Sequence, residues 1–208
     1  GAISDREIQS LHTAGLKARD LPVHAVELAD VVISVGYDIA EYDPAYWNKK
    51  SVPLIHIDFG DSEVYEYYQP EVEIIADIGA TLWELNCAFE KEKIEKYSSW
   101  YLPIRKSIEK DLLSYASVPK KLTTPYVLSV LRSVMKDDDI LISDVGSHKM
   151  WIGRNFPVYV AGTCLISNGL ASMGIALPGG MAAKLAKPDV RVVALMGDGG
   201  FLMNSQEI

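Results

Sequence analysis

The chain has 208 residues, 49% of them hydrophobic, with a formal net charge of −8 and a pI near 5. This length allows one large domain or two compact ones. Lys and Arg form no basic block, which disfavours nucleic-acid binding, and residues 169–183, the longest weakly polar stretch, are too short to span a membrane. Cys87 and Cys164 have neither metal-type spacing nor a disulfide framework, and no signal peptide opens the sequence. We therefore expect a cytoplasmic α/β protein.

Six short runs rich in Val, Ile and Leu predict strands that are covered on both faces, because apolar residues are nearly continuous in them. These runs are Val31–Val35, Leu54–Asp58, Val72–Ala76, Ile140–Ser143, Cys164–Ser167 and Val190–Met196. Helical patterns lie between them at 78–90, at 126–135 after a Thr124-Pro125 start, and at 171–186.

The alternation of strands and helices predicts a doubly wound parallel sheet, in two units. The first unit covers residues 1–90 and the second covers residues 122–208, with a helix and an extended linker at 91–121. Both units are expected to be incomplete, because the first has only three strands and the second stops at Ile208, early in a helix that opens at Gly199. We therefore expect an interior piece of a longer protein.

The strongest local motif is the turn Gly197-Asp198-Gly199-Gly200, which joins a predicted strand to a predicted helix. Ligands bind at the carboxyl ends of such strands, and glycines let the backbone approach a phosphate at the start of a helix. A carboxylate in this turn favours a divalent cation that bridges it to the phosphate. The alternative is a plain β-turn in which Asp198 caps the helix.

Two other predicted strands end in small or polar residues. After 140–143, Gly146, Ser147 and His148 would present donors at a helix start, although His148 taken alone fits a hydrogen-bonded loop residue better than a ligand group. After 164–167, Ala171 and other small residues surround Met173, the one bulky and adaptable side chain there. The alternative for Met173 is ordinary core packing.

Together these motifs resemble the diphosphate-binding domain of thiamine-diphosphate enzymes. The spacing of 25 residues between Met173 and Asp198 (198 − 173) is similar to that of the acetolactate synthase branch. Residues 36–48, Gly-Tyr-Asp-Ile-Ala-Glu-Tyr-Asp-Pro-Ala-Tyr-Trp-Asn, resemble a stretch of the catabolic, FAD-independent acetolactate synthases. The resemblance covers nearly the whole chain, from part of a central domain into the diphosphate-binding domain.

The resemblance implies that eight residues bind thiamine diphosphate: Gly146, Ser147, His148, Ala171, Met173, Asp198, Gly199 and Gly200. Asp198 would ligate Mg²⁺, Ala171 would offer its carbonyl to the aminopyrimidine, and Met173 would wedge between the two rings and hold the cofactor bent. An Asn-rich turn that completes the metal shell and the activating Glu are expected outside this chain, so the chain alone would be inactive.

The implied reaction condenses two pyruvates to 2-acetolactate with loss of CO₂, in branched-chain amino acid or acetoin metabolism, by a homodimer or homotetramer. FAD is not expected, because residues 36–48 contain no Arg or Lys where FAD-binding synthases carry an Arg-containing segment. The alternatives are a pyruvate oxidase, a 2-oxo acid decarboxylase, or a non-catalytic binding module. The last is weakened because no Gly-x-Gly-x-x-Gly follows a strand.

Overall fold

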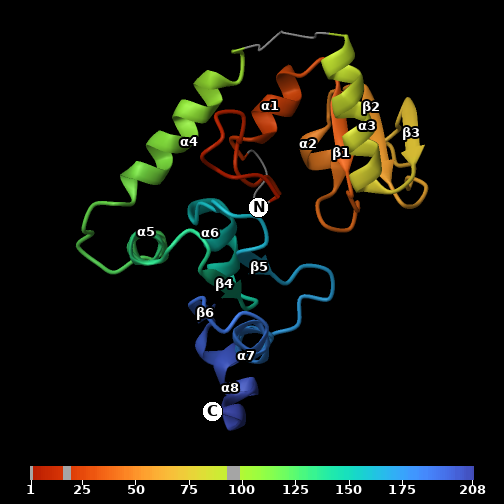
Figure 1. Ribbon diagram of the computed structural model, residues 1–208. Helices are drawn as coiled ribbons and strands as arrows, with labels where there is room; N and C mark the ends of the chain where they lie inside the picture. The colour runs from red at the N-terminus through yellow and green to blue at the C-terminus, as the bar shows by residue number, and fades with distance from the viewer. Residues whose placement is uncertain (1, 16–19, 93–98) are drawn as a thin grey trace. The chain divides into compact units, whose positions relative to one another are not determined.

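The computed structural model describes residues 2–15, 20–92 and 99–208, in two compact units (Figure 1). Unit 1 comprises Gly1–Leu16 and Arg105–Ile208, and unit 2 comprises Lys17–Ile104. The helix α4 (Leu102–Ser114) crosses the boundary between them. The domain limits predicted from the sequence remain a prediction, and residues 93–98 of the predicted linker lie outside the described residues.

Unit 2 is built on a parallel sheet with strand order β1-β2-β3. Its elements are α1 (Val23–Leu28), β1 (Val32–Val35), α2 (Pro44–Trp47), β2 (Leu54–Asp58), β3 (Val72–Ile75) and α3 (Ile78–Lys91). The core gathers Trp47, Leu54 and Tyr68, which are all buried. The central strand β2 is largely buried, whereas most residues of β3 are exposed. The prediction that every strand is covered on both faces is therefore wrong for β3, and also for β1, in which Ile33 and Val35 are exposed.

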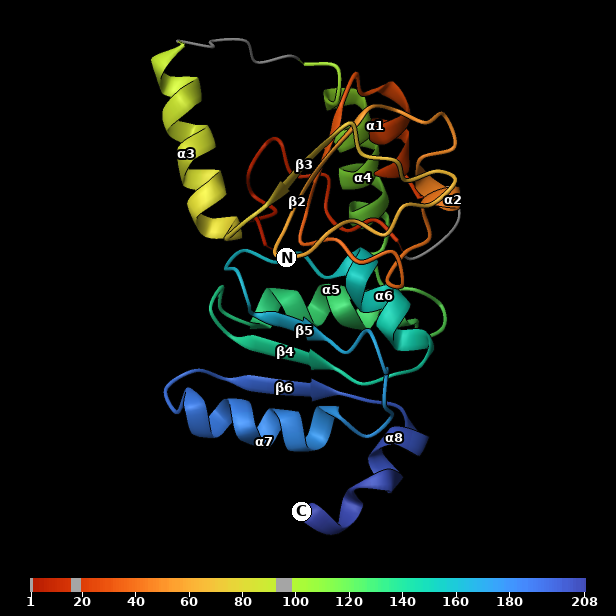
Figure 2. The ribbon, with the colours of Figure 1, turned by 90° about the vertical axis from the view of Figure 1, so that its right-hand side faces the viewer.

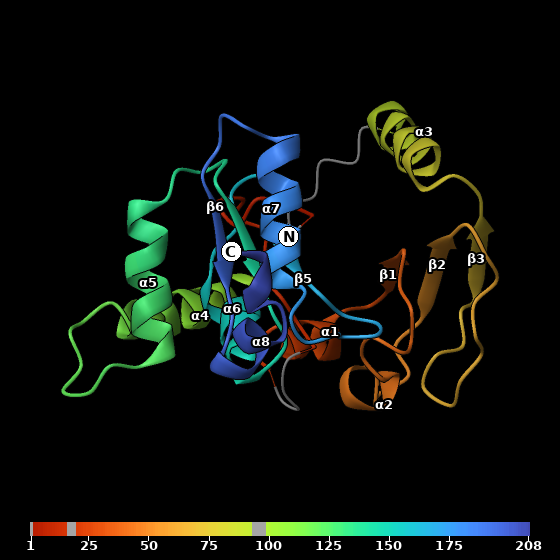
Figure 3. The ribbon, with the colours of Figure 1, turned by 90° about the horizontal axis from the view of Figure 1, so that it is seen from below.

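Unit 1 contains a second parallel sheet, with strand order β5-β4-β6. Its elements are α5 (Thr124–Val134), β4 (Ile140–Ser143), α6 (Ser147–Asn155), β5 (Cys164–Ile166), α7 (Ala176–Ala186), β6 (Val192–Leu195), α8 (Asp198–Met203) and a 3₁₀ helix at Ser205–Glu207. Helices α5 and α6 lie on one side of this sheet and α7 on the other (Figures 1 and 3). The predicted α/β class with two parallel-sheet units is confirmed.

The core of unit 1 follows from the two-residue period of its central strand. Leu141 of β4 is fully buried against Leu128 and Ile152, which come from α5 and α6. Ile142, the next residue, contacts α7, where a Cβ atom at Gly179 would lie 3.7 Å from its side chain. Both faces of β4 are therefore covered, as its continuous apolar sequence predicts.

The residues before α7 adopt a tight turn instead of a helix. The sequence pattern predicts a helix from residue 171, but α7 begins at Ala176. Ala171 and Gly174 have positive φ angles of 46° and 89°, which a right-handed helix excludes. No helix in the described part of the chain is long and apolar enough to cross a membrane.

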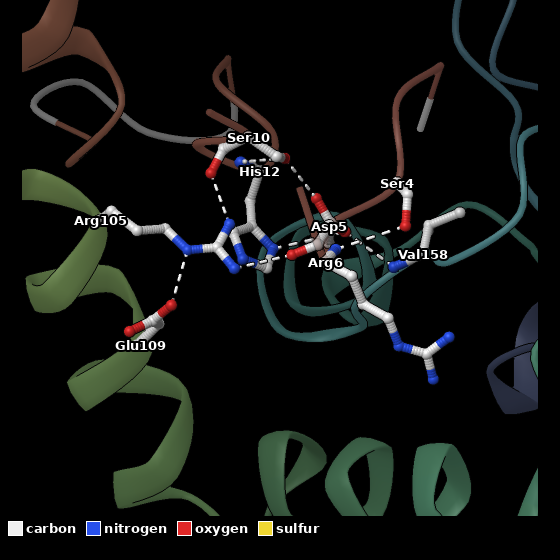
Figure 4. Close-up of polar contacts among 8 residues, drawn as sticks. All are labelled: Ser4, Asp5, Arg6, Ser10, His12, Arg105, Glu109 and Val158. Atoms are coloured by element: carbon white, nitrogen blue, oxygen red, sulfur yellow. Dashed lines mark hydrogen bonds and ion pairs between the residues drawn. The ribbon is translucent and has the colours of Figure 1, made fainter. Parts of the chain in front are cut away.

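Asp5 fastens the first residues of the chain to the rest of unit 1 (Figure 4). Its Oδ2 accepts a hydrogen bond from the backbone N–H of Val158 at 2.7 Å, and its backbone N–H donates to the Val158 carbonyl at 2.8 Å. The Ser10 hydroxyl donates to its Oδ1, and the Arg105 guanidinium donates to its carbonyl at 2.7 Å. His12 lies beside it, with Nδ1 3.4 Å from Oδ2. The segment is therefore held by paired backbone and side-chain bonds.

Candidate functional site

The three strands of unit 1 end at the same level, which brings the loops that follow them together. Ser143 at the end of β4 pairs with Ile166 of β5 on one side and with Leu195 of β6 on the other. Figure 2 shows the three arrowheads pointing toward the side where α6 and α8 begin. All eight residues assigned to the site by sequence lie in or directly after these loops. This edge is where parallel α/β sheets bind ligands.

Distances between the loops show that they are in contact. Cε of Met173, in the loop after β5, lies 3.4 Å from the place that a Cβ atom would occupy at Gly199, in the turn after β6. Cε1 of His148 lies 3.9 Å from the corresponding place at Gly197, which joins the loops after β4 and β6. The structure therefore brings the three sequence motifs to one place.

Met173 is 45% exposed, so its side chain is not part of the core of this chain. The cofactor role of Met173 and the alternative of core packing in the complete protein both remain predictions. Ala171, two residues earlier, has a left-handed φ of 46°, a conformation that costs a non-glycine residue about 1 kcal/mol or more. Such strain collects at ligand-binding positions, because it turns a backbone group toward a fixed direction.

The start of α6 offers a second set of donors. Gly146 is the N-cap of α6 and has no side chain to satisfy the free N–H groups of the first turn. A Cβ atom at Gly146 would lie only 2.9 Å from Cε1 of His148, so the histidine ring packs directly on this backbone. Nε2 of His148 is buried and has no hydrogen-bond partner within the described residues, so the described chain does not satisfy this ring nitrogen. The ligand-binding and loop-residue interpretations of His148 both remain predictions. Ser147 is exposed beside it.

Asp198 carries the negative charge of the site. It is exposed and is the first residue of α8, while Gly197 occupies the N-cap and makes no side-chain cap. Its Oδ1 accepts a hydrogen bond from the adjacent N–H of Gly199 at 2.9 Å. Among the described residues no group of three or more His, Cys, Asp or Glu side chains is placed to hold a metal ion. A cation at Asp198 would therefore draw its other ligands from elsewhere.

Sequence reasoning missed two residues that shape this edge. Asp144, directly after β4, is fully buried and accepts hydrogen bonds from the N–H of Gly174 at 2.8 and 3.0 Å. Asn204, directly after α8, donates from Nδ2 to the Gly174 carbonyl at 2.7 Å. A polar residue immediately after a buried strand is the one signal that could have pointed to Asp144.

The donor set fits a phosphorylated ligand that carries a divalent cation. Two helix starts, at α6 and α8, offer backbone N–H groups and partial positive charge. The exposed carboxylate of Asp198 suits Mg²⁺, which prefers oxygen ligands and binds phosphate oxygens together with one or two carboxylates. His148 is half-buried, and its Nε2 atom, which has no partner among the described residues, has the capacity for one further hydrogen bond.

Comparison with family models gives two matches. Residues 144–208 match the model described as "Thiamine pyrophosphate enzyme, C-terminal TPP binding domain". Residues 1–85 match the model described as "Thiamine pyrophosphate enzyme, central domain". The first match spans the three loops described above.

Individual relatives are acetolactate synthases. The chain is 34% identical over 191 residues to the acetolactate synthase of Bacillus subtilis (strain 168), covering 88% of this chain and 33% of the relative. It is 33% identical over 183 residues to the catabolic acetolactate synthase of Raoultella terrigena, covering 86% of this chain and 33% of the relative. The chain thus spans about a third of the length of the curated relatives that it matches.

Proposed function

Because this chain belongs to the thiamine pyrophosphate (thiamine diphosphate) enzymes and is similar to their acetolactate synthases, we propose that the complete protein condenses two pyruvates to 2-acetolactate. The reaction releases one CO₂. The observation that carries the proposal is the contact among the three loops at the carboxyl ends of β4, β5 and β6, within the matched diphosphate-binding domain.

The proposed cofactor contacts are divided among the loops. Asp198 holds Mg²⁺ by its exposed carboxylate, and the backbone of Gly199 and Gly200 in the first turn of α8 contacts the diphosphate, with Gly200 packed on its other side against Asp144. On the other side, the start of α6 contributes the backbone at Gly146, the hydroxyl of Ser147 and Nε2 of His148, which has no hydrogen-bond partner among the described residues.

The loop after β5 addresses the rings of the cofactor. Ala171, in its left-handed conformation, offers its carbonyl to the aminopyrimidine, and Met173 supports the bent form by its exposed side chain. Bound thiamine diphosphate supplies an electron sink for breaking and making the carbon–carbon bonds of 2-oxo acids. The residues of this chain contribute by holding that group in a reactive orientation.

The remaining parts of the proposal come from the resemblance seen in the sequence. We propose a homodimer or homotetramer that acts in the cytoplasm with Mg²⁺ and without FAD. The activating Glu would come from outside this chain, since the chain spans about a third of the matched relatives.

Product analysis tests the proposal. The complete protein is incubated with pyruvate, Mg²⁺ and thiamine diphosphate, and the products are identified by NMR. We expect one acetolactate and one CO₂ for every two pyruvates. Acetaldehyde as the main product would identify a decarboxylase instead, and bound flavin with oxidised product would identify an oxidase. A protein that binds no thiamine diphosphate would be a non-catalytic module.

A further inference from the structure

Asp144 is a fully buried carboxylate at the centre of the proposed cofactor edge. It directly follows β4, the central strand of its sheet, and its backbone N–H donates to the Leu195 carbonyl at the end of β6 at 2.9 Å. Its Oδ1 accepts hydrogen bonds from the N–H of Val145 at 2.7 Å and of Gly174 at 2.8 Å. Burying a carboxylate is costly unless it is hydrogen-bonded, so these contacts define its position narrowly.

The peptide groups of Gly174 are held from both sides. Asp144 accepts from its N–H, and Nδ2 of Asn204 donates to its carbonyl at 2.7 Å. Gly174 has a φ of 89°, and a Cβ atom there would lie 2.6 Å from Nδ2 of Asn204, so only glycine suits this position. Met173 directly precedes Gly174, so its backbone is joined to a residue whose N–H and carbonyl are both held by hydrogen bonds.

Asp144 also sets the place of α8. A Cβ atom at Gly200 would lie 2.3 Å from Oδ2 of Asp144, so this carboxylate is packed directly against the first turn of the helix. The Asp144 side chain therefore contacts both the loop that contains Met173 and the turn that contains Gly199.

We propose that Asp144 is a positioning residue that fixes the Gly174 peptide and thereby holds Met173 beside Gly199. The proposal rests on the proposed function, because Met173 has a catalytic role only when thiamine diphosphate binds at this edge. Asp144 itself is covered from solvent and acts through Gly174, not by contact with the ligand.

Asp139 provides a matched control at the opposite end of the same strand. It is 3% exposed and directly precedes β4. Its carboxylate accepts hydrogen bonds from the N–H of Lys136 at 2.8 Å and of Arg191 at 3.0 Å. Its removal leaves two partly buried backbone donors, the N–H groups of Lys136 and Arg191, without their acceptor, at the end of β4 away from Met173.

The first test compares Asp144→Ala with Asp139→Ala in the complete protein. Both substitutions are expected to lower Tm. Only Asp144→Ala is expected to lower kcat per bound cofactor, by about 10- to 100-fold, because misplacement of a positioning group by about 1 Å has effects of that size. Asp144→Asn keeps one acceptor oxygen for Gly174 and is expected to recover most of the loss. If Asp144→Ala does not fold, Asp144→Ser is compared with Asp139→Ser, because the shorter serine side chain does not reach the Gly174 N–H and the same loss of kcat is expected only at position 144.

The second test needs neither cofactor nor activity. Amide hydrogen exchange is followed by mass spectrometry on peptides that end on either side of Gly174. We expect Asp144→Ala to speed exchange at Gly174 by about tenfold or more relative to Asp139→Ala, since the hydrogen bond that protects this amide is lost. Equal exchange at Gly174 in the two variants, or equal kcat per bound cofactor, overturns the proposal.

The two proposals fail in different ways. Absence of thiamine diphosphate binding by the unsubstituted protein overturns the proposed function and with it the catalytic part of this inference. Unchanged exchange at Gly174 overturns this inference and leaves the proposed function standing.

Discussion

Met173 and Gly199 meet across two loops: Cε of the methionine lies 3.4 Å from the place of a Cβ atom at the glycine. Gly199 directly follows Asp198, the candidate ligand of Mg²⁺. The bulky side chain proposed to support the rings therefore stands next to the turn proposed to hold the diphosphate. Through this contact, the position of the side chain proposed to support the cofactor rings depends on the position of the turn proposed to bind the diphosphate.

Substitution of Met173 is expected to separate activity from stability. Because the side chain is 45% exposed, Met173→Ala should cost about 1 kcal/mol or less in the free energy of unfolding, as surface changes usually do. Turnover per bound cofactor should fall by about 10²-fold, because the wedge is lost. Met173→Leu conserves volume and should keep much of the activity. Tm, cofactor Kd and kcat are measured on both variants; a destabilised Ala variant with normal kcat per occupied site would contradict the wedge role.

Gly199 and Gly200 are expected to respond oppositely to alanine. A Cβ atom at Gly200 would lie 2.3 Å from the buried carboxylate of Asp144, so Gly200→Ala should lower stability by about 1–3 kcal/mol through overpacking. At Gly199 the nearest atom is at 3.4 Å, and alanine favours the helix, so stability should be kept. The added methyl group should weaken cofactor binding about tenfold, or about 1.4 kcal/mol. Thermal melts and Kd titrations check both, and a stable Gly200→Ala variant would disprove the packing argument.

Asp198→Asn is expected to weaken Mg²⁺ and thiamine diphosphate together, because the metal bridges the protein and the diphosphate. Excess of both should partly restore activity. Asp189→Asn, another exposed carboxylate before β6, serves as the control and should leave both affinities unchanged. Isothermal titration gives the two dissociation constants. A metal affinity in Asp198→Asn equal to that of the control would remove Asp198 from the metal site.

Asp5 is expected to make unit 1 sensitive to acid. Burial acts to raise its pKa, but hydrogen bonds led by that of His12 and by the N–H of Val158 outweigh burial and lower the pKa below the usual 3.8. A carboxyl with a lowered folded-state pKa contributes stability above its unfolded pKa, and that contribution is lost as the pH falls through the folded pKa.

The measurement compares Asp5→Asn with the unsubstituted protein from pH 6 to pH 3. The difference in Tm should be largest near pH 6 and should narrow below about pH 4. Asp138→Asn, an exposed residue, should show no such pattern. A difference that is constant over the whole range would mean that Asp5 contributes through packing alone.

Cys164 is expected to resist alkylation. Burial raises the pKa of its thiol to about 11, so about one thousandth is thiolate at pH 8. Cys87 is exposed, and both cysteines are free. Iodoacetamide at pH 8, followed by peptide mass spectrometry, should label Cys87 first. Labelling of Cys164 at an equal rate in the folded protein would show that its surroundings open on that timescale.

The sequence predicts the strands well because each is a short apolar run that only a sheet covers efficiently. All six runs are strands in the structure, within two residues at each end. The helix at 78–90 is likewise confirmed as α3. The convergence of the three glycine-containing motifs also follows from pattern alone, since parallel strands bring their carboxyl ends to one edge.

Other features depend on contacts that no local pattern contains. The late start of α7 follows from the turn at Gly174, whose peptide is held by Asp144 and Asn204, 30 residues away in each direction. The lack of a partner for Nε2 of His148 depends on burial by the surrounding chain. β3 is an edge strand and most of its residues are exposed, neither of which its apolar sequence reveals.

Unit 1 is discontinuous in sequence, and this affects the order in which the protein can fold during synthesis. Asp5 and Val158 are bonded although 153 residues separate them, and all of unit 2 lies between the two pieces of unit 1. On the ribosome, Lys17–Ile104 emerges as a continuous stretch and can complete its own contacts first. The segment that ends at Leu16 is made before unit 2, yet Asp5 finds its partners Arg105 and Val158 only after unit 2 has emerged. Its native contacts therefore form only after a separate folding unit has been synthesised.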